Sequence, residues 1–364
     1  MKVLITGVCG FVGFRVATTL AAAHPEWSLI GVDNLCRPGS ASNCSPLNQL
    51  GVQFLEADLR DRDLVQRWPQ ADWVIDCAAN TSVLAGRGEP SASQSLMDHN
   101  LIGTIHLLEY CKRHQAGLVL VSSSRVYSIP GLLALPYTLE GSRILPAWDQ
   151  VEPSEIGVGR HGIAETFSSQ PPLSLYGSTK LASELMAQEY SSAFEFPLWI
   201  NRCGLMAGAG QFGRADQGIV SFWIHSYLYR QRLRYIGFGG HGQQVRDCLH
   251  PDDLAGLILH QMRHPVDRSR PTICNVAGGN GSVFALCELT DWCARRWSSR
   301  IHPQELQIDR VTESRTYDCP WIVLDTSRAR DVWGWSPSRN LESILTEIAE
   351  HAESHPQWLE LSNG

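Results

Sequence analysis

VLITGVCGFVG, residues 3–13, decides the fold of this chain. A short aliphatic run leads into three glycines spaced three apart, Gly7, Gly10 and Gly13, and an apolar stretch with helical periodicity continues to residue 23. This order is typical of a buried strand, a tight turn and a helix whose N-terminus can hold a phosphate group. The spacing is GxxGxxG rather than GxGxxG, so the turn by itself fits an ordinary strand-to-helix connection as well as a dinucleotide site.

The first two hundred residues repeat this pattern of short apolar runs and longer helical segments. We interpret the runs as buried strands at 3–5, 28–32, 52–55, 73–75, 118–121 and 198–200. The segments with helical spacing lie at 11–23, 91–113 and 178–193. Strands that alternate with helices predict parallel βαβ units. The predicted fold class is therefore α/β, a Rossmann-like doubly wound parallel sheet with a smaller C-terminal α/β lobe that binds the substrate.

Two changes in residue composition along the sequence predict the domain organisation. Residues 128–172 are rich in Pro, Gly and Ser and show no sustained period, so we expect a long loop or insertion there. Beyond residue 200, glycine clusters separate shorter elements. We predict a cofactor domain over 1–200 and a substrate-binding lobe over 201–364, interleaved with that domain and closed by a helix over 341–351.

The composition is that of a soluble globular protein of 364 residues, 43 % of them hydrophobic and 18 % charged, with a net charge of −7. An acidic chain without a long basic block argues against nucleic acid as a partner. No apolar run approaches the roughly 18 residues that a membrane span needs. The 11 cysteines are scattered without disulfide or zinc spacing. We expect a cytoplasmic protein with no membrane partner and no metal site.

Acidic and small residues follow the next strands, where a bound dinucleotide would lie. Asp33 ends the second strand, 20 residues past Gly13. A carboxylate there can accept hydrogen bonds from both ribose hydroxyls of NAD and would repel the 2′-phosphate of NADP. NAD is therefore the predicted cofactor, although Arg37 can soften that preference. The residues placed to face the adenine and the pyrophosphate are Asp58, Leu59, Ala78 and Ala79.

A candidate catalytic pair lies in YGSTK, residues 176–180, because a phenol and an ammonium group four residues apart share one face of a helix. A nearby cation favours the ionised form of a phenol, which is the form that acts as a base. Upstream, VSSSRVY, residues 121–127, closes the fifth strand, so its hydroxyls emerge at the carboxyl edge of the sheet. A serine there can hold a substrate hydroxyl against Tyr176. A YxxxK pattern is common in helices, and only its occurrence with the strand and the glycine turn favours a site.

Taken together, these motifs make the chain resemble the extended short-chain dehydrogenase/reductase family of nucleotide-sugar epimerases and dehydratases. The motifs that carry the resemblance are TGVCGFVG (6–13), Asp33, DHNLIGT (98–104), SSSRVY (122–127) and YGSTK (176–180). It covers nearly the whole chain and implies an NAD-dependent enzyme with Ser123, Tyr176 and Lys180 as catalytic residues. The cofactor-binding residues expected here are Gly7, Gly10, Phe11, Val12, Gly13, Asp33, Asn34, Arg37, Asp58, Leu59, Ala78, Ala79, Asn100, Tyr176, Lys180 and Cys203.

The second half is similar to the CDP-paratose 2-epimerase branch of that family. The motifs that carry this similarity are QFG (211–213), DQG (216–218), GFG (237–239) and QVRDCLH (244–250). By this resemblance Arg246 contacts the diphosphate of the substrate, while Arg315 and Asp318 lie near its nucleotide. A planar guanidinium suits bidentate recognition of phosphate. The substrate-binding residues expected here are Ser124, Arg125, Gln211, Asp216, Gln217, Arg246, Arg315 and Asp318.

One departure from the family pattern bears on the reaction. The 4,6-dehydratases of the family need an Asp-Glu pair where this chain has Ser124 and Arg125, and an arginine cannot act as that acid. We therefore expect an epimerase that oxidises a ring hydroxyl to a transient ketosugar and reduces it from the other face. The alternatives are a UDP-sugar 4-epimerase, a net dehydrogenase or reductase, and a non-catalytic NAD-binding protein.

The resemblance also implies two partners. The small-molecule partner is a nucleotide-diphosphate sugar. The identity of its sugar stays open, because Ser123 and Tyr176 are 53 positions apart and the segment between them contains an unusually long insertion. The protein partner is a second copy of the chain. Helices 91–113 and 178–193 are similar to the pair that forms a four-helix homodimer interface in the family.

Overall fold

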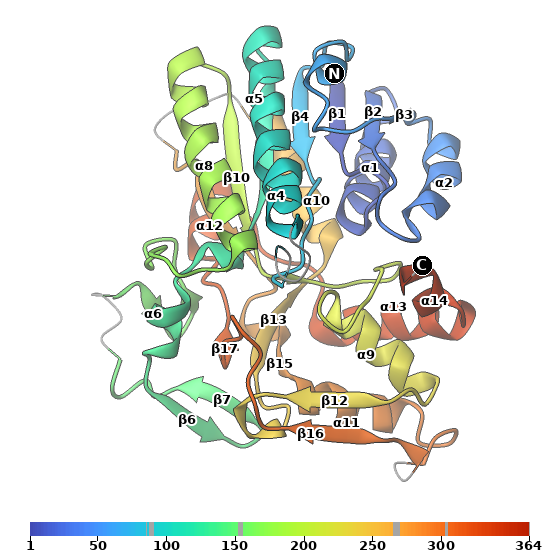
Figure 1. The fold of residues 1–364 in the computed structure, drawn as a ribbon, viewed down its shortest axis with the longest axis vertical. Helices are drawn as coiled ribbons and strands as arrows, with labels where there is room; N and C mark the ends of the chain where they lie inside the picture. The colour runs from blue at the N-terminus through green and yellow to red at the C-terminus, as the bar shows by residue number, and fades with distance from the viewer. Residues whose placement is uncertain (85, 87–90, 152–155, 265–269, 303–304, 364) are drawn as a thin grey trace.

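The computed structural model describes residues 1–84, 86, 91–151, 156–264, 270–302 and 305–363. Its centre is a seven-stranded sheet in which every neighbouring pair of strands is parallel. In spatial order the strands are β14 (Ile273–Val276), β10 (Leu198–Cys203), β5 (Gly117–Ser123), β4 (Trp73–Asp76), β1 (Lys2–Thr6), β2 (Ser28–Asp33) and β3 (Gln53–Glu56). The chain starts in the middle of the sheet and winds outward in both directions (Figure 1).

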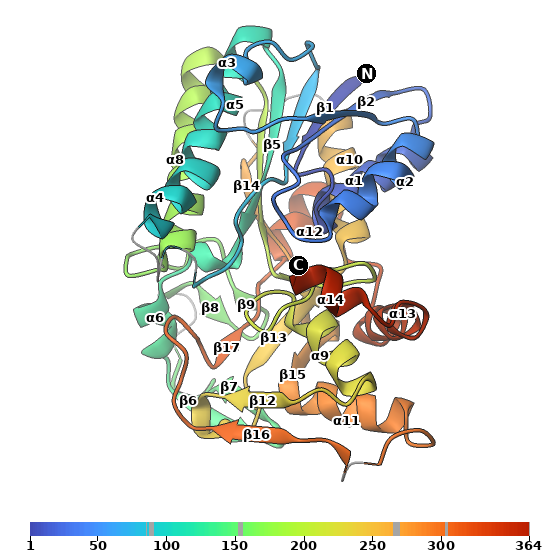
Figure 2. The same ribbon diagram turned by 45° about the vertical axis from the view of Figure 1, so that its right-hand side comes forward.

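Helices cover both faces of this sheet (Figures 1 and 2). One face carries α3 (Arg62–Val65), α4 (Ala92–Met97), α5 (Gly103–His114) and α8 (Leu175–Phe194). The other carries α1 (Phe11–Ala23), α2 (Cys44–Gln49), α10 (Pro251–Arg263) and α12 (Ser327–Trp333). Successive strand residues point to opposite faces, so Val3 and Ile5 of β1 enter one buried core while Leu4 enters the other. A strand buried on both faces is continuously apolar, which is why the short aliphatic runs predicted it correctly.

The predicted fold class is confirmed, with two differences in detail. The helix expected over 91–113 is interrupted by a π-helical turn, η2 (Asp98–Ile102), between α4 and α5. The sheet also has a seventh strand, β14, that the sequence did not predict. Its four residues are flanked by polar and glycine-rich segments, so they show neither the length nor the alternation that marks a strand.

A second lobe lies below the carboxyl ends of the sheet strands in Figure 1. Its strands are β11 (Leu205–Met206), β12 (Leu233–Ile236), β13 (Val245–Leu249), β15 (Val283–Ala285), β16 (Ile308–Val311) and β17 (Trp321–Ile322). Its helices are α9 (Ile219–Leu228), α11 (Leu286–Arg296), α13 (Leu341–Ser354) and α14 (Trp358–Asn363). Buried Trp223, Tyr227 and Trp297 pack there against Ile344 and Ile348 of α13. Because α10, β14 and α12 return to the main sheet, the chain passes between the two parts more than once; the boundary at residue 200 stays a prediction.

The segment 128–172 is not the featureless loop that its composition suggested. It contains the short helix α6 (Ile129–Leu133), the hairpin of β6 (Tyr137–Glu140) and β7 (Arg143–Pro146), and the pair β8 (Val158–Gly159) and β9 (Gly162–Ile163). Residues 152–155 lie outside the described residues. Elements this short show no sustained hydrophobic period, which explains why the sequence did not predict them individually.

Four 3₁₀ turns complete the described structure: η1 (Ser40–Asn43), η3 (Ser124–Val126), η4 (Phe238–Gly240) and η5 (Asn280–Ser282). None of the helices described has the length and apolarity needed to cross a membrane.

Candidate active site

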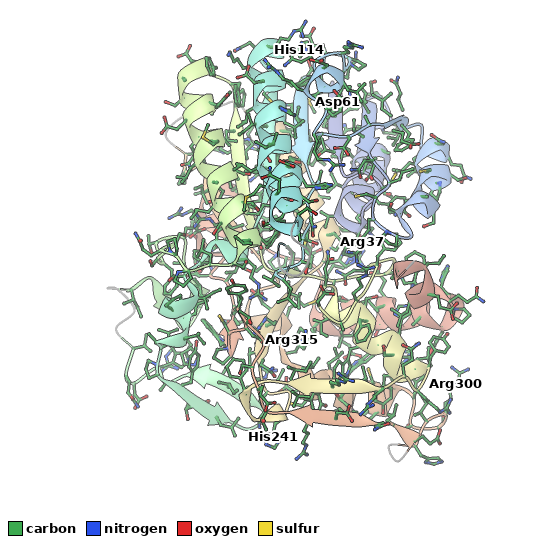
Figure 3. The ribbon with its side chains drawn as sticks, viewed as in Figure 1. Arg37, Asp61, His114, His241, Arg300 and Arg315 are labelled. Carbon is green, nitrogen blue, oxygen red and sulfur yellow. The ribbon has the colours of Figure 1, made fainter. Side chains whose placement is uncertain are left out.

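A pocket of about 750 Å³ lies at the carboxyl edge of the sheet, between the sheet and the second lobe. The sequence-predicted site residues line this pocket, with the exception of Asn100. Some lie in the sheet layer, such as Asp33 and Tyr176, and others in the second lobe, such as Arg246 and Asp318. Figure 3 shows Arg37 where the two parts meet and Arg315 within the second lobe. The topology thus brings together residues that are up to about 300 positions apart in the sequence. The carboxyl edge of the sheet, where they meet, is where ligands of doubly wound sheets bind.

The glycine turn between β1 and α1 forms a cradle that side chains would fill. Gly7 has a left-handed backbone (φ +62°), and a Cβ there would lie 2.8 Å from the Cα of Ala78. A Cβ at Gly13 would overlap the carbonyl oxygen of Gly7. The turn can adopt this shape only with glycine at these positions. The residues present therefore fit a pyrophosphate held against backbone N–H groups at the start of α1.

We expect Gly13→Ala to reduce NAD affinity about tenfold or more, because the new methyl group displaces the turn that holds the pyrophosphate. The measurement is the dissociation constant for NAD by isothermal titration calorimetry. Gly256→Ala is the matched control, since Gly256 is an exposed position of α10 with open space around its Cα. That change should leave NAD affinity unaltered and raise stability by roughly 0.5–1 kcal/mol. Equal NAD affinities for wild type and Gly13→Ala would show that the turn does not hold the cofactor.

The acidic residues at the adenosine end of the pocket are fixed by hydrogen bonds. Asp33 accepts from the backbone N–H of Cys9 (2.9 Å) in the glycine turn and from that of Leu35 (2.8 Å). Burial raises the pKa of Asp33, while these N–H groups oppose the rise. Asp58 accepts from Asn34 Nδ2 at 2.9 Å and from Arg60, which holds its pKa well below the ordinary range. Each carboxylate oxygen of Asp33 keeps a further lone pair, which fits the acceptor that a ribose diol requires.

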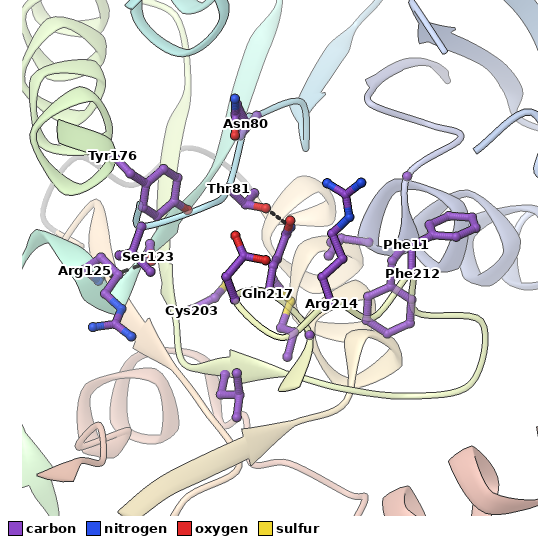
Figure 4. A pocket seen from close by; sticks show the side chains of 18 of the residues that line it. Phe11, Asn80, Thr81, Ser123, Arg125, Tyr176, Cys203, Phe212, Arg214 and Gln217 are labelled. Atoms are coloured by element: carbon purple, nitrogen blue, oxygen red, sulfur yellow. Dashed lines mark hydrogen bonds between the residues drawn. The ribbon is translucent and has the colours of Figure 1, made fainter. Parts of the chain in front are cut away.

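The three predicted catalytic side chains meet at the opposite end of the pocket. Tyr176 lies in the first turn of α8, whose N-terminus is capped by Ser174 through the N–H of Gly177 (3.0 Å). Lys180 is buried one turn later and donates to the carbonyl of Val121 at 3.0 Å. Ser123 ends β5, and Figure 4 shows it at the same end of the pocket as Tyr176.

Gly177 explains how α8 comes so close to the end of β5, and the sequence did not single it out. A Cβ at Gly177 would overlap the carbonyl oxygen of Arg125 in η3. The absence of a side chain lets the first turn of α8 pack directly on the backbone that follows Ser123. Its signal was present as the second letter of the YGSTK motif, but the contact joins residues 52 positions apart and has no local pattern.

Asn100, predicted to contact the cofactor, does not line the pocket. It is buried in η2, where its Oδ1 accepts from the N–H of Asn80 (2.8 Å) and its Nδ2 donates to the carbonyl of Asn80 (3.0 Å) and to Thr179 Oγ1 (3.1 Å). Both polar atoms of the Asn100 side chain are therefore hydrogen-bonded within the wall of the pocket. It supports Asn80, which does line the pocket, and ties this wall to α8.

The predicted substrate residues of the second lobe are held in two groups. Arg246 forms an ion pair with Asp318 at 2.7 Å. Gln211, Asp216 and Gln217 belong to a loop, 211–218, that lines the pocket.

Contacts of loop 211–218 connect it to the cofactor half of the pocket. Asp216 accepts from Ser82 at 2.8 Å, and Gln217 donates to Thr81 (Figure 4). Arg37 donates to Gln217 Oε1 (2.5 Å) and to the carbonyl of Phe212 (2.6 Å), so in this structure it is committed to the loop. Thr81 and Ser82 were not predicted, because nothing in the sequence connects them with residues more than 130 positions away.

A buried polar network lies behind the catalytic end and was also missed. Arg202 of β10 forms a bidentate ion pair with Glu184 of α8, with a shortest distance of 2.6 Å. Ser122, next to the predicted catalytic residue Ser123, donates to the same carboxylate. Burial opposes the charge of Arg202, but the Glu184 carboxylate raises its pKa above the ordinary value. The network fixes β5, α8 and β10 to one another directly behind the pocket.

The parallel sheet, the glycine cradle and the Ser, Tyr and Lys side chains at one pocket end define a nucleotide-dependent enzyme of the short-chain dehydrogenase/reductase type. The model of the NAD dependent epimerase/dehydratase family matches residues 3–277, so the chain belongs to this family. The family is NAD-dependent, which confirms the predicted cofactor.

Relatives within the family cover nearly the whole chain. CDP-paratose 2-epimerase of Salmonella typhi is 26 % identical over 97 % of this chain and 100 % of its own length. dTDP-glucose 4,6-dehydratase of Salmonella typhimurium strain LT2 is 23 % identical over 99 % and 94 %. The crystal structure of UDP-glucuronic acid 4-epimerase from Bacillus cereus superposes with a TM-score of 0.76 at 21 % identity, covering 97 % of this chain and 99 % of that one. This likeness shows the shared fold. The relatives span two reaction types, so similarity alone leaves the reaction open.

Proposed function

We propose that this protein is an NAD-dependent epimerase of a nucleotide-diphosphate sugar. One observation carries the proposal: Tyr176, Lys180 and Ser123 lie together at one end of the pocket, and the two residues after Ser123 are Ser124 and Arg125 instead of an acidic pair. Epimerisation needs a base, a hydroxyl anchor and a bound oxidant that is regenerated. Dehydration needs an additional acid to expel water, and a guanidinium does not release a proton near neutral pH.

In the proposed mechanism, NAD would supply, when bound in the glycine cradle, the reversible acceptor for a hydride from a ring carbon of the sugar. Tyr176, as phenolate, takes the proton of the neighbouring ring hydroxyl and gives it back in the second half of the cycle. Ser123 holds that oxygen against Tyr176. Lys180, fixed by the carbonyl of Val121, lies one turn after Tyr176 and would contact the nicotinamide ribose when NAD is bound. The transient ketosugar must turn over in the pocket between the two steps, after which the configuration is inverted.

The finer proposal is a CDP-paratose 2-epimerase-like enzyme that inverts C2 of a CDP-linked sugar. It is supported by the full-length similarity to the Salmonella typhi enzyme and by the motifs around Gln211 and Arg246. The same catalytic trio also suits inversion at C4 of a UDP-sugar, as in the UDP-glucose 4-epimerase of Mycoplasma pneumoniae, which is 25 % identical over 95 % of this chain. A net dehydrogenase or reductase would differ by releasing the reduced cofactor.

The test is incubation of the purified protein with a panel of CDP-, UDP- and dTDP-sugars in deuterated water, followed by NMR. We expect inversion at one ring carbon, without added NAD and without deuterium on carbon. Loss of water with deuterium incorporation would identify a dehydratase, and accumulation of reduced cofactor would identify a dehydrogenase. Binding of NAD without conversion of any sugar would favour a non-catalytic role.

We also propose that the protein forms a homodimer through the exposed side of α5 and α8. Leu185 on α8 is 56 % exposed and Ile102, which precedes α5, is 37 % exposed. Leu185→Asp should weaken the dimer by about tenfold or more, because each interface loses a buried leucine and gains a desolvated charge. Multi-angle light scattering at several concentrations measures the mass. Leu139→Asp changes an equally exposed leucine on β6 and should leave the mass unaltered. A wild-type monomer at all concentrations would contradict this proposal.

A further inference from the structure

Arg125 is fixed next to the reacting groups by the backbone on both sides. It follows Ser123 by two residues, and its N–H donates to Ser123 Oγ at 3.2 Å. Its carbonyl oxygen lies against Gly177, the residue after Tyr176, with no room for a side chain between them. The Arg125 side chain lines the pocket, and Figure 4 shows it beside Ser123 at the end where Tyr176 lies. Arg125 therefore lines the pocket end where, in the proposed mechanism, the sugar of the substrate reacts.

The charge of Arg125 is not neutralised by any carboxylate of the described residues. Its Nη1 donates a hydrogen bond to the carbonyl of Tyr317 at 3.2 Å. The charged and titratable groups that face it are Arg246, Asp318, Cys319 and Tyr176. Asp318 is already bound to Arg246 at 2.7 Å, and Arg246 repels a second cation. Burial together with Arg246 lowers the pKa of Arg125.

Buried Arg202 and half-buried Arg246 are held differently from Arg125, which is itself half-buried. Arg202 is held by Glu184 at 2.6 Å, and Arg246 is held by Asp318. A guanidinium that is taken out of water without an anionic partner is costly, and an enzyme keeps one where a ligand supplies the anion. Arg37 and Arg315 also line the pocket and contact loop 211–218 through Gln217 and the carbonyl of Ala215, and Arg214 is part of that loop. Arg125 is the arginine among them that lies beside Ser123 (Figure 4).

We propose that Arg125 binds an anionic substituent on the sugar ring, so that the preferred substrates are nucleoside-diphosphate sugars with an acidic group, such as the carboxylate of a uronic acid. This inference rests on the proposed function. It concerns the sugar and leaves the nucleotide and the inverted carbon open. It departs from the neutral deoxyhexose that similarity to a CDP-paratose 2-epimerase suggests. A guanidinium pairs with a carboxylate through two parallel hydrogen bonds, which also fixes the orientation of the ring.

The test measures binding without chemistry, in NAD-loaded Tyr176→Phe protein, so that a phenolate cannot contribute to the result. UDP-glucose and UDP-glucuronic acid form a matched pair that differs only in the group at C6, and UDP-galactose and UDP-galacturonic acid form a second pair. Because each pair shares one nucleotide, a preference for another base lowers both affinities equally. Isothermal titration calorimetry should show the acidic sugar of one pair or both binding about 10- to 100-fold more tightly than its neutral counterpart.

Adding Arg125→Gln should reduce this preference to within about twofold, and Arg125→Lys should retain part of it, since the charge remains while the two-pronged geometry is lost. Arg330→Gln makes the same change on an exposed arginine of α12 and should leave the preference intact. Equal affinity for acidic and neutral sugars in protein that has Arg125 would overturn the proposal. So would an equal loss of affinity for UDP alone in Arg125→Gln, because Arg125 would then be a diphosphate ligand.

Failure of the proposed function remains distinguishable from failure of this inference. A protein that prefers acidic sugars through Arg125 but inverts none of them would contradict only the epimerase. A protein that inverts neutral sugars and binds both members of each pair equally would contradict only the role of Arg125. If Arg125→Gln melts below wild type, Arg125→Lys supplies the comparison, since it preserves the buried charge.

Discussion

Tyr176→Phe should lower the turnover of the nucleotide sugar by about 10²- to 10⁴-fold, the range typical of losing a positioned general base. Phenylalanine keeps the ring that packs at the start of α8 and removes only the group that accepts the proton. The fold and the glycine cradle are untouched, so NAD should remain bound. The measurement is the initial rate on the sugar identified in the panel, together with the absorbance spectrum of the protein as a check on bound cofactor.

Tyr190→Phe is the control for this prediction because it deletes the same oxygen from the same helix. Tyr190 donates to Glu109 at 2.8 Å outside the pocket, and its loss should leave the rate close to that of wild type. A Tyr176→Phe protein that retains the wild-type rate would show that another group takes the proton. The mechanism built on Tyr176 and Lys180 would then be wrong.

The sheet could be predicted from the sequence to the extent that each strand carried its own signal. β1, β2, β4, β5 and β10 are buried on both faces, so each appears as an uninterrupted apolar run bounded by polar residues. The edge strand β14 is held by its pairing with β10 and has no such signal of its own. Its place depends on contacts between distant parts of the chain, and a local pattern does not record those.

The residues of the site likewise fall into two groups, those that a local sequence pattern identifies and those that it does not. The candidate cofactor-binding and catalytic residues could be named from the sequence because their spacing is local: the glycines of the turn follow one strand, and Tyr176 and Lys180 share one helix. The residues that hold them were missed because their partners are remote. Gly177 matters through the carbonyl of Arg125, and Asn100 serves the backbone of Asn80 rather than the cofactor. Sequence spacing therefore indicates which groups could react, while the structure shows what positions them.

Glu184→Ala should lower the free energy of unfolding by about 3–5 kcal/mol, because it leaves the charge of Arg202 buried without a partner. The side chains of Glu184 and Arg202 are only 1 % and 7 % exposed. The hydrogen bond from Ser122 to Glu184 would be lost. The hydrogen bond from Arg202 to the hydroxyl of Tyr127 would remain, but without the carboxylate that neutralises Arg202. Urea unfolding followed by tryptophan fluorescence measures the change, at one NAD concentration for all variants, since bound NAD itself stabilises the fold.

Glu305→Ala is the control that separates the effect of burying an ion pair from the effect of its geometry. The Glu305–Arg230 pair has the same shortest distance, 2.6 Å, but its side chains are 40 % and 47 % exposed. Water replaces the lost partner of an exposed arginine, so we expect a much smaller loss in the free energy of unfolding than in Glu184→Ala. Equal losses in the two variants would mean that water reaches the Arg202 site. Because Ser122 precedes Ser123, the predicted catalytic serine, we expect the buried network also to position Ser123 in the pocket. Glu184→Ala should therefore lose activity at temperatures where the protein is still folded. Glu305→Ala should keep its activity at those temperatures.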